Sequence, residues 1–147
     1  MTITELKQQK RWVLWRLEMI RNGRGELVPT KVPYHFSGWH ASSTDSSTWC
    51  TYSEAQAAVG GYSGIGVMMS DGLGCADLDH CVDPSTRKIL PWAREIIIAL
   101  DSYSEFSPSG TGVHIIGQDI KLPGKGRKRP YESGAVEVET GRQNGRD

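Results

Sequence analysis

Two short segments of the chain, residues 74–79 and residues 107–115, constrain its fold and chemistry more than any other feature. The first reads Gly-Cys-Ala-Asp-Leu-Asp and the second reads Ser-Pro-Ser-Gly-Thr-Gly-Val-His-Ile. The first predicts a strand with two acidic side chains, and the second predicts a glycine-rich turn that leads into an apolar strand. Because alternate residues of a strand lie on one face of a sheet, Asp77 and Asp79 should lie side by side.

The two aspartates point to a divalent cation. Two like charges held side by side are unfavourable unless something positive lies between them, and ligands that are all oxygen favour Mg²⁺ or Mn²⁺. A calcium loop of the EF-hand type is a poor match. Counted from Asp77, its sixth position is Val82 and its twelfth is Lys88, where that loop needs Gly and Glu. Asp77 could also be the nucleophile of a phosphotransferase, but the sequence contains no other signature of such an enzyme.

The glycine-rich turn suits a phosphate group, because backbone N–H groups in such a turn can face an anion. Gly110 and Gly112 bracket Thr111, and His114 follows on the apolar strand. A strand histidine that only faces solvent is the plainer interpretation of His114, and the glycines just before it weaken that interpretation. Together the two segments predict a site for a metal-bound nucleotide.

Composition limits the class of protein. The 147 residues suffice for one domain with one sizeable core, and 17 basic residues balance 17 acidic ones, so the net charge indicates no partner. No stretch approaches the apolar length of a membrane span, and the first ten residues lack the apolar segment of a signal peptide. Three cysteines without regular spacing argue against a disulfide framework or a zinc site. We therefore expect a cytoplasmic protein with no membrane partner.

The order of the predicted elements is typical of an α+β fold, an open sheet with helices on one side. Strands and helices are expected as follows: strands at 11–17, 27–33, 65–69, 73–79, 113–116 and 135–139, and helices at 54–59 and 91–101. A turn at residues 22–25 joins the first two strands. A capping-box pattern that starts at Ser53 precedes the first helix, and Pro91 opens the second, which carries an apolar stripe.

A basic loop is expected at residues 121–130, and its charged side chains form a local positive patch of the kind that binds phosphate backbones. These side chains are Lys125, Arg127, Lys128 and Arg129. A loop that is merely solvated is the plainer alternative. On the strand that follows, Glu137 and Glu139 share one face, and an ordinary solvent-exposed face is the alternative to a functional one.

The five tryptophans are assigned mostly to the core of the protein. Trp12, Trp15 and Trp92 lie on the periodic apolar faces of predicted elements. Nothing in the sequence marks any tryptophan as a platform on which nucleic-acid bases stack.

Three elements occur in a fixed order: Asp-x-Asp, Ser-Gly-x-Gly-x-His, and a later acidic residue on a strand. This order resembles the archaeo-eukaryotic primase superfamily. More closely, the chain resembles the primase–polymerase (prim-pol) domain at the N-terminus of plasmid and phage replication proteins. The likeness runs from residue 11 to residue 139. Its further stretches are residues 12–15, 31–33, 43–49, 64–67 and 102–112.

The resemblance implies a role for each motif. Asp77 and Asp79 would be metal-binding carboxylates, and Glu137 would complete the metal site, with Glu139 as an alternative that the sequence does not separate from it. The residues that would hold the triphosphate of the incoming nucleotide are Ser109, Gly110, Thr111, Gly112 and His114. The implied fold is an archaeo-eukaryotic primase-like core, a compact α/β unit packed on an RRM-like sheet with the site on the sheet face.

The implied function is that of a DNA-dependent primase or polymerase of a mobile-element replication protein, which transfers nucleotides with the help of Mg²⁺ or Mn²⁺. Its partners would be nucleoside triphosphates, a single-stranded DNA template, a primer, and a helicase domain or subunit. Two alternatives stay open: a nucleotide- or nucleic-acid-binding module of the same fold without chemistry, and a metal-dependent nuclease.

The end of the chain departs from the family. The family continues after its third motif with an aromatic and threonine-bearing segment near an arginine, and residues 142–147 lack that signature. We expect one prim-pol-like catalytic domain over residues 1–147, with truncation at its C-terminus as one explanation of the departure.

Overall fold

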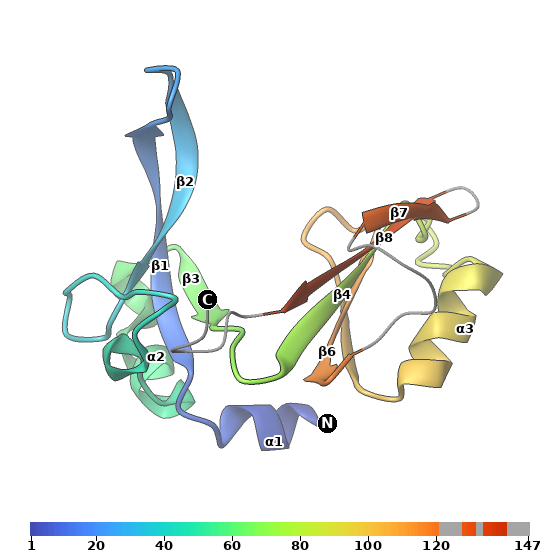
Figure 1. Cartoon of the computed structure of the whole chain (residues 1–147), viewed down its shortest axis with the longest axis horizontal. Coiled ribbons are helices and arrows are strands. Elements are labelled where there is room, and N and C mark those ends of the chain that lie inside the picture. The colour runs from blue at the N-terminus through green and yellow to red at the C-terminus, as the bar shows by residue number, and fades with distance from the viewer. Residues whose placement is uncertain (121–127, 132–133, 141–147) are drawn as a thin grey trace. The chain divides into compact units, whose positions relative to one another are not determined.

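The structure is a computed structural model, and it describes residues 1–120, 128–131 and 134–140. The chain forms two compact units (Figure 1). Residues 4–68 are called the N-terminal unit, and residues 69–147 together with residues 1–3 are called the C-terminal unit. Each unit contains one antiparallel sheet and is described by itself. That both units serve one catalytic domain stays a prediction.

The N-terminal unit is built on a three-stranded sheet in the order β2-β1-β3. Its strands are β1 (Trp12–Arg21), β2 (Leu27–Tyr34) and β3 (Gly64–Val67). The turn between β1 and β2 is fixed by Asn22, whose side-chain oxygen accepts hydrogen bonds from the N–H groups of Arg24 and Glu26. The turn predicted at residues 22–25 is therefore confirmed.

The same part of the chain also forms short helical segments, which are α1 (Ile3–Lys7), η1 (Ser46–Thr48), α2 (Tyr52–Ala58) and η2 (Val59–Gly61). The capping box of α2 is formed by Thr51, whose hydroxyl accepts from the N–H of Glu54, while the Glu54 carboxylate accepts from the N–H of Thr51. The prediction of a box starting at Ser53 was wrong, because the same pattern is satisfied two residues earlier and Ser53 lies inside the helix. Helix α1 was not predicted.

The C-terminal unit is built on a five-stranded antiparallel sheet in the order β5-β6-β4-β8-β7 (Figure 1). Its strands are β4 (Leu73–Asp79), β5 (Tyr103–Phe106), β6 (Val113–Gln118), β7 (Lys128–Tyr131) and β8 (Gly134–Thr140). Strand β4 has the predicted bounds, whereas β5 was not predicted. The expected basic loop needs a correction, because residues 128–130 belong to the edge strand β7, and residues 121–127 lie outside the described residues.

Helix α3 (Pro91–Leu100) covers one face of the five-stranded sheet. Its Trp92 and Ala93 are buried in a core with four residues that alternate along the two central strands. These four are Ala76, Leu78, Val113 and Ile115. The helix ends one residue earlier than predicted, because Asp101 takes a left-handed conformation with a φ of 44° and caps it.

Strand alternation sends the other residues of β4 to the opposite face of the sheet. Ala76 and Leu78 face the core, so Cys75, Asp77 and Asp79 lie on the face that α3 does not cover, where all three are half-buried. The two aspartates therefore share one face, as the sequence predicted.

Over the residues that the structure describes, the fold is mixed α/β, with two small antiparallel sheets and few helices, and it is consistent with the α+β class. Among the described residues, no helix has both the length and the apolar character needed to cross a membrane.

Candidate functional site

The uncovered face of the five-stranded sheet carries a row of charged and polar residues at one level of all five strands. Strand register pairs Glu105 with His114, His114 with Asp77, Asp77 with Glu137, and Glu137 with Lys128. Residues directly opposite one another in an antiparallel pair share a face of the sheet. The register therefore gathers residues from strands β4, β5, β6, β7 and β8, which are separated in the sequence.

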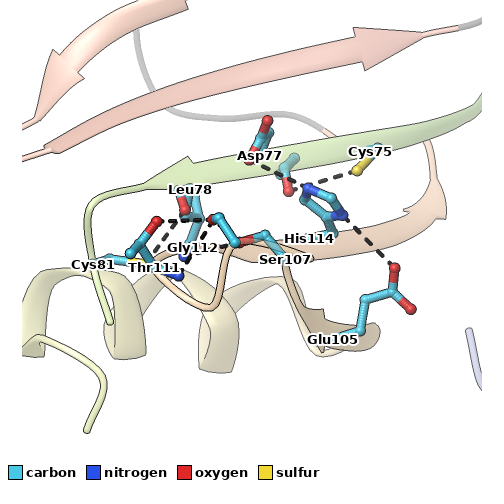
Figure 2. A network of polar contacts seen from close by, with 11 residues as sticks. Cys75, Asp77, Leu78, Cys81, Glu105, Ser107, Thr111, Gly112 and His114 are labelled. Carbon is cyan, nitrogen blue, oxygen red and sulfur yellow. Dashed lines mark hydrogen bonds and ion pairs between the residues drawn. The ribbon is translucent and has the colours of Figure 1, made fainter. Parts of the chain in front are cut away.

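His114 lies between two carboxylates (Figure 2). Its Nε2 is 3.6 Å from Oδ1 of Asp77, and its Nδ1 is 3.7 Å from Oε1 of Glu105. These separations are too long for hydrogen bonds but are within ion-pair range. The His114 side chain is 27% exposed and that of Asp77 is 31% exposed, although Oδ1 of Asp77 itself is buried.

Asp79 lies two residues beyond Asp77 on the same face, and its register partner is Ala135. Glu137 stands directly opposite Asp77, whereas Glu139 stands opposite Cys75, one step further from Asp79. The strand register thus distinguishes the two glutamates, which the sequence alone did not, because Glu137 and not Glu139 stands opposite Asp77. Among the side chains that the structure describes, no group of three His, Cys, Asp or Glu residues is close enough to hold a metal ion. The glutamates of β8 are placed by register alone.

The glycine-rich turn is held together by its own hydrogen bonds. The N–H of Gly110 donates to the carbonyl of Ser107, and the N–H of Gly112 donates to the Ser107 hydroxyl at 3.0 Å. The N–H of Thr111 faces the Ser109 hydroxyl at 3.4 Å. The backbone donors that the sequence assigned to a phosphate are thus engaged within the turn.

Two glycines are required here for different reasons. Gly110 has a φ of 77°, a conformation that other residues rarely adopt. A Cβ on Gly112 would lie 2.6 Å from the carbonyl oxygen of Leu78, so the turn packs directly against the end of β4. The carbonyl of Thr111 accepts hydrogen bonds from the N–H groups of Cys81 and Val82, which fixes the turn from the other side.

Hydroxyl groups line the exposed side of the turn. The Ser107 and Ser109 hydroxyls are 3.0 Å apart, and the Ser109 and Thr111 hydroxyls are 2.9 Å apart. Such a chain of hydroxyls can reorient its hydrogens toward an anion. Sequence reasoning missed Ser107 and also Glu105. Ser107 could have been found from its alternation with Ser109 and Thr111. Glu105 could have been found only by recognising the edge strand β5, to which it belongs.

Cys81 lies close to this turn but is a poor metal ligand. Burial raises the pKa of the Cys81 thiol, which donates a hydrogen bond to the carbonyl oxygen of Leu78 with Sγ 3.4 Å from that oxygen. A thiol must lose its proton to bind a metal. Cys81 is therefore not a candidate ligand beside the carboxylates and the imidazole of the sheet face.

The four basic residues assigned to nucleic acid divide into two pairs. Lys125 and Arg127 lie outside the described residues. Lys128 and Arg129 begin the edge strand β7, where Lys128 stands opposite Glu137 and Arg129 opposite Val136. Lys128 thus occupies the last position in the row that contains His114 and Asp77.

Comparison with known proteins agrees with the resemblance found in the sequence. No family model matches the chain. A protein named DNA Primase-polymerase from Nitratiruptor phage NrS-1 is 36% identical to this chain over an alignment 148 residues long, which includes 95% of this chain. The chain spans only 19% of the length of that phage protein. The similarity supports a prim-pol-like family for the chain.

Proposed function

We propose that the chain is a primase–polymerase domain of a mobile-element replication protein, with an archaeo-eukaryotic primase-like core, which transfers nucleotides from nucleoside triphosphates onto a DNA-templated strand. One observation carries the proposal: Asp77, His114 and Glu137 occupy one row of the uncovered sheet face, in a chain similar to a phage primase-polymerase. Asp77 and Glu137 are 60 positions apart in the numbering, so only the folded sheet brings them together.

The acidic residues of this face would hold the metal. Asp77 and Asp79 alternate on β4, and Glu137 stands opposite Asp77, so the set offers carboxylate oxygens alone. Such ligands suit Mg²⁺ or Mn²⁺. When bound, a pair of these ions supplies charge stabilisation for the attacking 3′-hydroxyl and the departing pyrophosphate. Register favours Glu137 over Glu139 as the third carboxylate.

His114 and the hydroxyls of the turn would hold the triphosphate. The Nε2 atom of His114 lies beside Asp77, so the imidazole is within reach of an anionic group that binds next to the carboxylates. Ser109 and Thr111 present hydroxyls on the exposed side of the turn. Because phosphoryl transfer asks little covalent chemistry of the protein, the contribution of these groups is positioning and charge neutralisation.

The partners of the domain follow from the same proposal. They are nucleoside triphosphates, a primer and a single-stranded DNA template, whose backbone would be contacted by Lys125, Arg127, Lys128 and Arg129. A helicase domain or subunit would supply unwound template. The cytoplasm is the expected setting.

A primer-extension assay tests the proposal. The chain is incubated with a labelled primer on a DNA template, deoxy- or ribonucleotides, and Mg²⁺ or Mn²⁺. The proposal predicts a longer primer that depends on both the metal and the nucleotides. A shortened primer would indicate a metal-dependent nuclease, and an unchanged primer that is nevertheless bound would indicate a non-catalytic binding module. Either result would overturn the proposal.

A further inference from the structure

Glu105 is a carboxylate of the uncovered sheet face to which the proposed function gives no role. It belongs to the edge strand β5, and strand register places it directly opposite His114 of β6. Residues that stand opposite each other in an antiparallel pair have Cβ atoms about 4.5–5.5 Å apart. The backbone of the sheet therefore keeps this carboxylate beside the imidazole.

The two nitrogen atoms of the imidazole face different carboxylates, which lie on opposite sides of the ring (Figure 2). Nδ1 of His114 is 3.7 Å from Oε1 of Glu105, and Nε2 is 3.6 Å from Oδ1 of Asp77. A half-turn of the ring about its bond to Cβ would replace both nitrogens with C–H groups, which are weaker partners for a carboxylate. The position of Glu105 therefore favours the ring orientation in which Nε2 lies on the Asp77 side.

The carboxylate of Glu105 is itself held in place. Tyr103 lies two residues earlier on β5 and so shares its face of the sheet. The Tyr103 hydroxyl donates a hydrogen bond to Oε2 of Glu105 at 2.7 Å. The other carboxylate oxygen, Oε1, is the one that faces the imidazole. A hydrogen bond at Oε2 thus fixes the direction in which Glu105 presents Oε1.

Glu105 is separated from Asp77 by the imidazole that lies between them. Within the described part of the chain, the three side chains of Asp77, His114 and Glu105 do not form a cluster that could hold a metal ion. A carboxylate in direct contact with a triphosphate would repel it, whereas Glu105 lies at the far ring nitrogen. Its route to the proposed triphosphate site is therefore through His114.

We infer that Glu105 is a positioning residue, which holds the imidazole of His114 in the orientation that presents Nε2 to the triphosphate of the incoming nucleotide. The inference rests on the proposed function, and it adds a residue of β5 to the triphosphate site. The Glu105 side chain is 44% exposed, so water screens its charge. Its contribution is the placement of an acceptor oxygen, which the Tyr103 hydroxyl supports.

The test is a double-mutant cycle measured by titration of a nucleoside triphosphate in the presence of Mg²⁺. The cycle compares the wild-type chain with Glu105→Ala, with His114→Ala and with the double variant. Glu105→Gln keeps an acceptor oxygen and removes the charge. Glu95→Ala is the matched control, because it removes an exposed carboxylate from α3, which covers the other face of the sheet. Oligonucleotide binding and urea unfolding of every variant report changes outside the triphosphate site.

We expect Glu105→Ala to weaken triphosphate binding about three- to ten-fold, within the range of couplings between residues of one network. Oligonucleotide binding should not change. In the His114→Ala background the same substitution should have no further effect, because the ring that Glu105 positions is absent. Glu105→Gln should restore most of the lost affinity, and Glu95→Ala should bind like wild type.

Three results would overturn the inference and leave the proposed function standing, provided that His114→Ala still weakens triphosphate binding. The first is wild-type affinity in Glu105→Ala. The second is an undiminished loss from Glu105→Ala in the His114→Ala background, because Glu105 would then act independently of the imidazole. The third is a loss in Glu105→Gln equal to that in Glu105→Ala, because the charge and not the acceptor oxygen would then be needed. A wild-type chain that binds no triphosphate would overturn both the proposed function and this role of Glu105.

Discussion

At the scale of single residues, Gly110 and Gly112 show that two glycines of one turn serve different physical needs. Gly110 needs a left-handed φ, and Gly112 needs room beside the carbonyl of Leu78. We predict that Gly110→Ala lowers the free energy of unfolding by about 1 kcal/mol through backbone strain. Gly112→Ala should lower it by about 3 kcal/mol, because a backbone oxygen 2.6 Å away must be displaced. Urea unfolding of both variants measures the difference, and equal losses would contradict it.

His114 provides the second prediction at this scale. His114→Ala should weaken nucleoside triphosphate binding roughly ten- to a hundred-fold, the worth of a charge-assisted hydrogen bond. Binding of a template oligonucleotide should change much less, because His114 lies on the carboxylate face beside Asp77. Titration of a triphosphate and of an oligonucleotide against the same variant separates the two effects. Unchanged triphosphate affinity would return His114 to the role of a strand residue that only faces solvent.

His35 gives the molecule a pH dependence that is unrelated to the sheet face. Burial lowers the pKa of His35; Glu54 opposes this shift and Lys10 adds to it. The unfolded chain therefore binds the proton more readily than the folded one, and stability contributed by the neutral imidazole is lost as the pH falls below about 6.5. We predict that His35→Gln makes the midpoint of urea unfolding less sensitive to pH over that range. An unchanged pH dependence in the variant would contradict the assignment.

At the scale of elements, the long periodic segments of the C-terminal unit were predictable, and the two short edge strands of its sheet were not. Strand β4 and helix α3 were predicted within one residue, because an apolar alternation and an apolar stripe each bury a face against the same core. Strands β5 and β7 are four residues long and lie at the two edges of the sheet. Each of these strands forms its hydrogen bonds with a single neighbouring strand, and its short sequence shows little hydrophobic alternation. For this reason β7 was predicted as a loop.

The basic segment that leads into β7 carries the prediction at this scale. Replacement of Lys125, Arg127, Lys128 and Arg129 with Ser should weaken binding of single-stranded and primed templates alike. Each lost phosphate contact should lower the slope of log affinity against log salt by about 0.7 to 0.9. A control with Lys88 and Arg94 replaced removes exposed charge from the region of α3 and should keep the wild-type slope. An unchanged slope in the fourfold variant would mean that the segment only connects two strands.

At the scale of the whole molecule, the sequence placed Asp77 and Asp79 on one face of a strand but did not reveal which residues stand opposite them on the neighbouring strands. The shared face of Asp77 and Asp79 follows from strand alternation and was predictable. The choice between Glu137 and Glu139 depends on which residue of β8 stands opposite Asp77, and register is set by the whole sheet. The contact of Glu105 with His114 depends on pairing between β5 and β6 in the same way. The exposure of Trp39 was missed because tryptophan is a residue type that is highly buried on average.

We propose above that the Asp77 face of the five-stranded sheet performs metal-dependent nucleotidyl transfer. The decisive experiment is primer extension in Mn²⁺ by the wild type, Asp77→Asn and Glu95→Ala. Asn keeps the shape of the side chain and removes its charge, and Glu95 is an exposed carboxylate on α3, which covers the other face. We expect Asp77→Asn to be folded but to fail to extend the primer, while Glu95→Ala extends it like wild type. Extension near the wild-type rate by Asp77→Asn would show that the Asp77 carboxylate is not needed for nucleotidyl transfer.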